Sequence, residues 1–124
     1  DVPALLALAE DTELISPCDH FPVNPLSSMY PWRLVGNKPS IMLGEYLLWC
    51  AEAKSFPSMT ALRTIEGFAS LNPVLIDEIR KPDQRLDGDD ILSVRKLYQD
   101  WWNANGHLDN PPSLPLDGSG YSWH

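Results

Sequence analysis

The side chains best suited to chemistry in this sequence are three carboxylates and a group of tryptophans. Glu45 and Glu66 each lie in a segment otherwise rich in apolar residues, where burial would shift the pKa of a carboxyl group. Asp19 is the third candidate. A carboxylate beside a ring-stacking tryptophan is typical of a carbohydrate-binding or hydrolytic site. For Glu45 a structural role competes, namely a buried hydrogen bond to free N–H groups around Ser27 and Ser28.

The tryptophan content is high, with five in 124 residues. Trp101 and Trp102 are adjacent on a predicted helix, where successive side chains point about 100° apart. One should therefore face the core, and the other should lie beneath the C-terminal segment or on an exposed groove. Exposed tryptophans stack on sugars and anchor protein partners. We predict a binding site that draws on Trp32, Trp102, Trp123 and Glu45, and we assign no catalytic residue.

Three short motifs contain reactive residue types but lack the spacing that the chemistry requires. The Asp87–Asp90 run could offer oxygen ligands, but it lacks the alternating ligands and terminal Glu of a calcium loop, so we interpret it as a helix cap. Cys18 and His20 have no second ligand pair to complete a zinc site. Asp117–Gly120 lacks the lysine and the helix of a phosphate loop. The sequence therefore predicts no metal and no cofactor.

The charge balance of the chain restricts its partners. Nine Lys and Arg against seventeen Asp and Glu give a net charge of -8, the wrong sign for a protein that gains affinity by neutralising phosphates. We therefore expect a protein partner and no nucleic acid. No apolar run is long enough to cross a hydrocarbon layer about 30 Å thick, so no transmembrane segment is predicted.

The two cysteines leave the redox state open. A disulfide between Cys18 and Cys50 would close a loop of about thirty residues and stabilise the fold by about 3 kcal/mol. Cys50 also lies in an apolar helical stretch, where a free buried thiol is an ordinary small core residue. Either state is compatible with the sequence.

Prolines, glycines and capping residues divide the chain into helices and loops. Periodicity predicts helices at Pro3 to about Leu14, Ser40 to about Ala53, Met59 to Ala69, Pro73 to about Arg80, and Asp87 to Gly106. The second is apolar on nearly every side, so we expect it to be central. The fourth should bury Leu75, Ile76 and Ile79. Five prolines between residues 16 and 39 exclude a helix or a central strand and predict a long ordered loop.

These elements predict an all-α fold, a compact bundle of about four to five short helices in a single domain over residues 1–124. No stretch alternates apolar and polar residues for long enough to predict a strand. Residues 107–124 carry no helical period and should form an irregular segment packed on the aromatic end of the last helix. Its expected docking points are Leu108, Leu114, Leu116, Tyr121 and Trp123.

A pattern of loop and aromatic positions gives a resemblance to a known family. It consists of Phe21–Ser28, Gly44-Glu45, Leu48-Trp49, Tyr98 with Trp101-Trp102, and Pro115-Leu116 with Gly120–Trp123. In these positions the chain resembles a family of small exported bacterial lipoprotein-type domains of unknown function. The resemblance implies a signal-cleaved protein that is periplasmic or extracellular, with a lipid tether upstream of Asp1. It implies no active site.

Two functions from different classes remain. The first is an exported protein-binding module, such as an inhibitor or immunity-like protein, whose acidic surface meets a basic partner while an aromatic side chain anchors the contact. The alternative is a small carbohydrate-binding or hydrolytic domain that uses an exposed tryptophan and a carboxylate. No acid, base and nucleophile converge in spacing, so the sequence favours the binding module over an enzyme.

Overall fold

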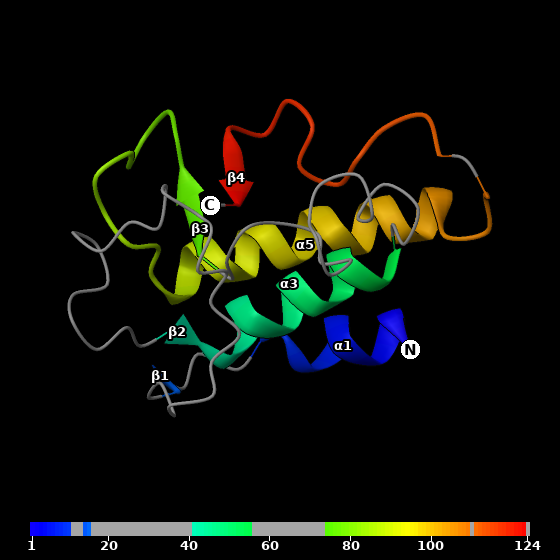
Figure 1. Cartoon of the computed structure of the whole chain (residues 1–124), viewed down its shortest axis with the longest axis horizontal. Coiled ribbons are helices and arrows are strands. Elements are labelled where there is room, and N and C mark those ends of the chain that lie inside the picture. Colours follow the sequence, from blue (N-terminus) through cyan, green and yellow to red (C-terminus); the bar gives the residue numbers. More distant parts are fainter. Residues whose placement is uncertain (11–13, 16–40, 56–73, 110, 124) are drawn as a thin grey trace, which may run out of the picture.

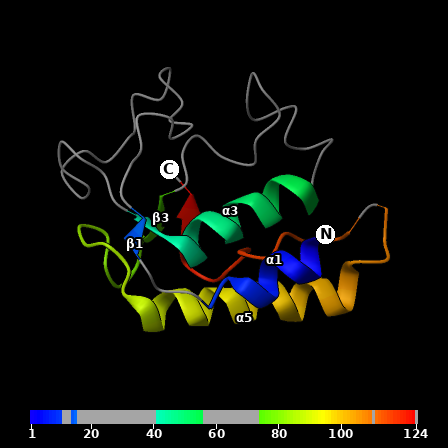
Figure 2. The same ribbon diagram turned by 90° about the horizontal axis from the view of Figure 1, so that it is seen from below.

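Three helices form the main body of the part of the chain that the structure describes. The computed structural model describes residues 1–10, 14–15, 41–55, 74–109 and 111–123. Its helices are α1 (Val2–Leu8), α3 (Leu43–Ser55) and α5 (Gly88–Asn105). Each of the three contacts the other two, and they pack as one group (Figures 1 and 2). Among the described residues, no helix is both long and apolar enough to cross a membrane.

Four short strands within the described residues accompany these helices. β1 (Leu14–Ile15) pairs with β2 (Ile41–Met42), and β3 (Leu75–Asp77) pairs with β4 (Tyr121–Trp123), both in antiparallel orientation. The prediction of an all-α bundle of four to five helices is therefore wrong, because the described part is a small mixed α/β structure. Each strand is two or three residues long, too short for alternation to be recognised in the sequence. The partner strand is also distant along the chain, so the local sequence pattern does not indicate the pairing.

The predicted fourth helix does not form. Leu75 and Ile76 are buried as expected, but they lie in β3, and Ile79 is 76% exposed. The Asp77 carboxylate accepts the backbone N–H groups of Ile79 and Arg80 at 3.1 and 2.9 Å. These bonds satisfy the donors within a turn, and this is why the chain turns after β3 and does not continue as a helix.

The first two predicted helices exist, but α1 is shorter than expected and α3 starts and ends later. α1 is capped by Asp1, whose carboxylate accepts the N–H of Ala4, and it ends at Leu8. α3 begins at Leu43 because the residues just before it form β2. No side chain within residues 42–52 is exposed, which confirms the central position predicted for this helix.

α5 confirms the prediction for the last helix. Asp87 and Asp90 form a capping box at its start, in which each carboxylate accepts the backbone N–H of the other residue. Gly106 follows the last helical residue. The buried face consists of the four residues that the period indicated, Ile91, Val94, Tyr98 and Trp101.

The C-terminal segment is part of the folded structure, as predicted. Tyr121 is buried, and Leu116 and Trp123 pack against the central hydrophobic cluster. Trp101 Nε1 donates a 2.8 Å hydrogen bond to a carbonyl oxygen of this segment. Two expectations about it are wrong: Leu108 is 43% exposed, and the end of the segment is the strand β4.

Some expectations fall on residues outside the described part. They concern the proline-rich loop at 16–39, the helix at 59–69, and the side chains of Cys18, Asp19, Trp32 and Glu66. Cys50, by contrast, is described, and it is a free, half-buried thiol.

The core lies where the three helices meet the β3–β4 pair, and Leu48 of α3 is fully buried in it. Leu48→Ala should lower the free energy of unfolding by about 2–5 kcal/mol, because the truncation leaves a cavity. Leu92→Ala is the matched control, since Leu92 is 41% exposed on α5 and its truncation should cost less than about 1 kcal/mol. Denaturant unfolding measures both, and equal costs would contradict this placement of the core.

Deleting residues 114–124 should lower the thermal midpoint by several degrees, because it removes β4 from β3 and uncovers the aromatic side of α5. Tryptophan fluorescence should become more accessible to a soluble quencher. Gly118→Ala is a mild control within the same segment, because its backbone φ of 72° is strained for alanine but no atom lies within 4 Å of the added Cβ. An unchanged melt of the truncated chain would show that the segment is not docked.

Candidate functional site

The structure places the described members of the predicted binding site against the core. Trp102 and Trp123 are half-buried and pack on the central cluster, and Glu45 is 4% exposed. Trp102 also lies against the backbone of Gly106, where a Cβ would come within 2.7 Å of a ring carbon. Trp32 lies outside the described residues. Trp102 and Trp123 are therefore only partly exposed.

A buried hydrogen-bond chain connects β4 to two helices. Trp123 Nε1 donates to Tyr98 Oη at 2.9 Å, and Tyr98 Oη donates to Glu52 Oε2 at 2.6 Å. Tyr98 and Glu52 are 2% and 5% exposed. Buried polar groups need such partners, so this chain of bonds positions β4 against α5 and α3.

Glu45 is a second buried carboxylate of α3, and it lies at the junction of that helix with β3. Its Oε1 accepts the backbone N–H of Leu75 at 2.8 Å, and its Oε2 lies 3.7 Å from Nη2 of Arg85. The expected partners around Ser27 and Ser28 lie outside the described residues. The bond that the structure shows therefore runs to β3, which the sequence did not indicate.

Burial raises the pKa of Glu45 to about 7 from its ordinary value of 4.5. The N–H of Leu75, the guanidinium of Arg85 and the N–H of Met42 act in the opposite direction and do not outweigh the burial. Glu45 therefore titrates near neutral pH, in keeping with the perturbed pKa that its apolar surroundings in the sequence suggested.

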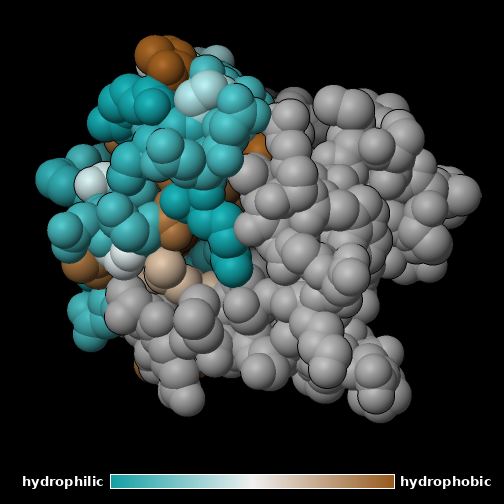
Figure 3. All heavy atoms as spheres, turned by 90° about the vertical axis from the view of Figure 1, so that its left-hand side faces the viewer, coloured by the Kyte–Doolittle hydropathy of each residue, from teal (hydrophilic) through white to brown (hydrophobic). Residues whose placement is uncertain are grey.

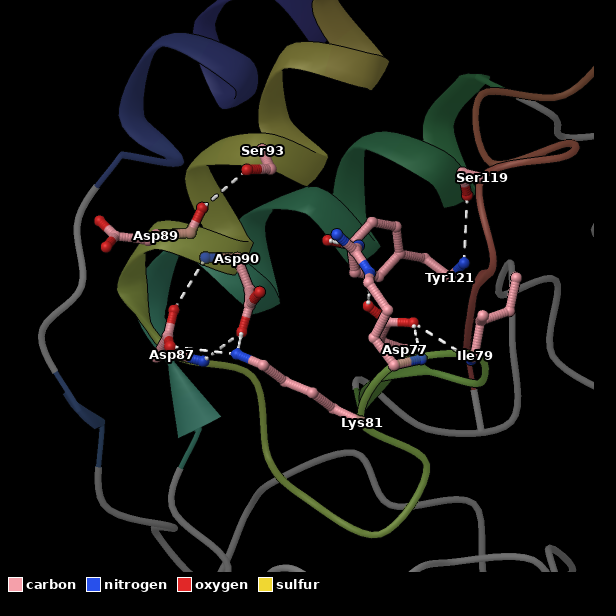
Figure 4. A network of polar contacts seen from close by, with 10 residues as sticks. Asp77, Ile79, Lys81, Asp87, Asp89, Asp90, Ser93, Ser119 and Tyr121 are labelled. Carbon is pink, nitrogen blue, oxygen red and sulfur yellow. Dashed lines mark hydrogen bonds and ion pairs between the residues drawn. The ribbon is translucent and has the colours of Figure 1, made fainter.

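A second polar cluster, the β3 corner, consists of residues 77–81 with Gly120 and Tyr121. Figure 4 shows Asp77, Ile79, Lys81 and Tyr121 of this cluster. Arg80 Nε donates to Asp77 Oδ2 at 2.6 Å, and Arg80 Nη2 donates to Tyr121 Oη at 2.6 Å. The guanidinium carbon also lies 5.3 Å from the centre of the Tyr121 ring. Asp77 and Tyr121 are paired residues of β3 and β4. One arginine thus holds both strands of the corner together.

Asp77 stays acidic although it is fully buried. Burial alone would raise the pKa of this carboxyl, but the N–H groups of Arg80 and Ile79 and the Arg80 guanidinium outweigh it and hold the pKa below its ordinary value. The ionised carboxylate is therefore the form that the corner is built around.

The Asp87–Asp90 run is a helix cap, and a lysine pairs with both of its capping carboxylates. Lys81 Nζ lies 3.2 Å from Asp87 Oδ2 and 2.6 Å from Asp90 Oδ2. This ammonium takes the position that a bound cation would need, and it ties the β3 corner to the start of α5 (Figure 4). Among the described residues, no group of three potential ligands could hold a metal ion.

Sequence reasoning missed Ile79, the most exposed large apolar side chain of the described residues. Ile79 lies over Gly120, whose φ is 86°. A Cβ on Gly120 would come within 2.8 Å of Ile79 Cδ1, so the glycine leaves room for this side chain. Periodicity placed Ile79 on a buried helix face. The signal that could have revealed the turn is Asp77, since Asp favours turns over helix interiors.

Five cationic side chains that the structure describes pair with carboxylates of the chain itself. The ion pairs join Arg80 to Asp77, Lys81 to Asp87 and Asp90, Arg85 to Glu45, Arg95 to Glu10, and Lys96 to Asp100. None of these cations pairs with the exposed Asp89, Asp109 or Asp117. Figure 3 shows the described residues on one side of the molecule as mainly hydrophilic, with isolated apolar side chains.

Asp77→Asn should destabilise the fold at neutral pH, because it removes the charge that pairs with Arg80. The pKa of Asp77 is lowered on folding, so its ionised form stabilises the protein above about pH 4, and this contribution disappears as the pH falls through the lower pKa of the folded state. The variant and the wild type should therefore differ most near neutrality and converge in acid.

Denaturant unfolding between about pH 2 and pH 7 measures this convergence. Asp100→Asn is the matched control, because the Lys96–Asp100 pair is mostly exposed and should contribute little at any pH. A difference between wild type and Asp77→Asn that stays constant with pH would contradict the role of the ionised carboxylate.

The comparisons with known proteins give one result. No curated protein and no solved structure shows a significant match to the chain. A family model matches residues 1–124, and the family carries no assigned function. The resemblance seen in the sequence was likewise to a family of unknown function. The chain belongs to the family described as a domain of unknown function, DUF4943.

Proposed function

We propose that this chain is a protein-binding module that meets a basic partner through its acidic surface, with Ile79 as the apolar anchor. The observation that carries the proposal is the β3 corner, which holds a large apolar side chain 76% exposed at a fixed turn. Tightly binding interfaces are centred on a few apolar anchors with a polar rim, and this corner has both parts.

The rigidity of the turn supports a role for Ile79 in recognition. The Asp77 carboxylate bonds to the N–H groups of Ile79 and Arg80, and the Arg80 side chain bonds to Asp77 and Tyr121. An anchor held in this way loses little conformational freedom on binding, which favours affinity. The sequence predicted an aromatic anchor, whereas Trp102 and Trp123 are half-buried and Trp49 and Trp101 are buried.

The charge of the surface supports a basic partner. The chain has a net charge of -8, and Arg80, Lys81, Arg85, Arg95 and Lys96 are already paired with its own carboxylates. Negative charge therefore remains at exposed positions such as Asp89, Asp109 and Asp117. A surface of one sign accelerates association with a partner of opposite sign and weakens with added salt.

The carbohydrate-binding or hydrolytic alternative gains less support from the described residues. It needs an open tryptophan next to a carboxylate that a ligand can reach. Trp102 and Trp123 are half-buried and Glu45 is buried, so these three side chains do not offer that combination.

We further propose that the binding takes place outside the cytoplasm, in the periplasm or at the cell surface, as for an inhibitor or immunity-like protein. The support is the resemblance to exported lipoprotein-type domains. Fractionation of the native host, with the chain followed by antibody, tests this placement. Recovery with a cytoplasmic marker would contradict it.

Ile79→Ala should weaken binding of the partner about tenfold or more, because it truncates the anchor without touching the core. Leu8→Ala is the matched control: Leu8 is 63% exposed on α1, away from the corner, and its loss should leave affinity unchanged. The immobilised chain is exposed to a native-host extract in low and about 0.5 M salt, and the retained protein is identified, purified and titrated calorimetrically. Equal affinity of the two variants, or binding that does not weaken with salt, would contradict the proposal.

A further inference from the structure

The Glu45 carboxylate connects three parts of the chain that are far apart in sequence. Glu45 belongs to the first turn of α3, its Oε1 accepts the N–H of Leu75 in β3, and its Oε2 lies near Arg85 in the segment that leads to α5. The side chain of Glu45 is 6% exposed and that of Arg85 is 27% exposed. The carboxylate is therefore enclosed, while the nearest cation is still in partial contact with water.

The bond to Leu75 lies on the edge of β3 that faces away from β4. The N–H of Glu78 donates to Gly120, in line with β4, and alternate residues of a strand direct their N–H groups to the same side. The N–H of Leu75 therefore points to the opposite side, where the Glu45 side chain accepts it at 2.8 Å. The carboxylate takes the place that a third strand would occupy.

We propose that Glu45 is a pH-sensitive latch between α3 and the β3–β4 sheet, closed while its carboxyl is protonated and loosened when it ionises. An enclosed carboxylate is stable in its charged form only when hydrogen bonds and an opposite charge replace the water that it has lost. The separation of 3.7 Å between Glu45 Oε2 and Arg85 Nη2 is too long for a hydrogen bond, so Arg85 compensates only in part.

Within the described residues, three elements contribute polar or charged groups to the surroundings of Glu45. β2 and β3 contribute N–H donors, from Met42 and Leu75, and the segment before α5 contributes the Arg85 guanidinium. The other two cations of that segment are engaged elsewhere, Arg80 by Asp77 and Lys81 by the cap of α5. Arg85 is thus the described cation that acts on the carboxyl.

The direction of the pH effect follows from the burial. Burial raises the pKa of Glu45 to about 7 in the closed form, whereas a hydrated carboxyl in an opened junction would titrate near 4.5. The open form binds fewer protons between these values, so it gains population as the pH rises. Between about pH 6 and pH 8 the open population should increase about tenfold.

Amide hydrogen exchange of the full chain, resolved by NMR, tests the latch at Leu75. After correction for the intrinsic rate, the protection factor of the Leu75 amide should fall about tenfold between about pH 6 and pH 8. In Glu45→Gln, which keeps an oxygen for the Leu75 N–H but cannot ionise, the protection should stay level. Glu10→Gln removes the same charge at an exposed ion pair and should behave as the wild type.

Two results would overturn the latch. The first is a Leu75 protection factor in the wild type that does not change with pH. The second is a Leu75 protection factor as high as that of the core amide of Val94 throughout this range, because Leu75 would then exchange only when the whole fold unfolds and not through opening of this junction. If Glu45→Gln does not fold, the chemical shift of the Leu75 amide in the wild type, followed as a function of pH, tests the latch instead. A midpoint near 7 supports the latch, and one near 4.5 contradicts it.

Discussion

The two backbone edges of β3 are the constraint on which the described structure depends. A strand of three residues cannot stand alone, and each edge of this one is satisfied by a different part of the chain. β4 pairs with one edge, and the Glu45 carboxylate accepts from Leu75 at the other. Because Glu45 lies in the first turn of α3, the same bond also fixes the start of that helix against the sheet. Buried N–H groups that lost either partner would be left unsatisfied.

Three buried carboxylates set the directions in which the elements pack. Apolar burial holds the helices together but is not directional. Glu45, Glu52 and Asp77 add the direction, since each accepts hydrogen bonds whose geometry is narrow. Glu52 receives its bond from Tyr98 of α5, and Asp77 holds the arginine that also reaches Tyr121 of β4. Elements far apart in sequence are thereby joined at defined atoms.

The surface follows from the same requirements of the interior. The Asp77 carboxylate accepts the N–H groups that follow β3 and so stabilises a turn, and Ile79 is exposed in this turn. Carboxylates of the chain itself, some buried and some exposed, engage Arg80, Lys81, Arg85, Arg95 and Lys96, so these cations do not offset the exposed Asp89, Asp109 and Asp117. An anchored apolar residue and a negatively charged rim are consequences of how the fold satisfies its buried groups, and they give the binding proposal its physical basis.

The sequence by itself determined the features that depend on local sequence pattern or on overall composition. The cap and buried face of α5, the central α3, the docking of the C-terminal segment and the acidic charge all depend on neighbouring residues or on composition. Only the tertiary structure decided that β3 and β4 form and pair, that Glu45 bonds to Leu75 and that Ile79 is exposed. Leu75, Ile76 and Ile79 fit a helical period as well as a strand and turn. The choice between them rests on hydrogen bonds to Glu45 and Tyr121–Trp123, which lie about thirty to fifty residues away and leave no trace in the local pattern.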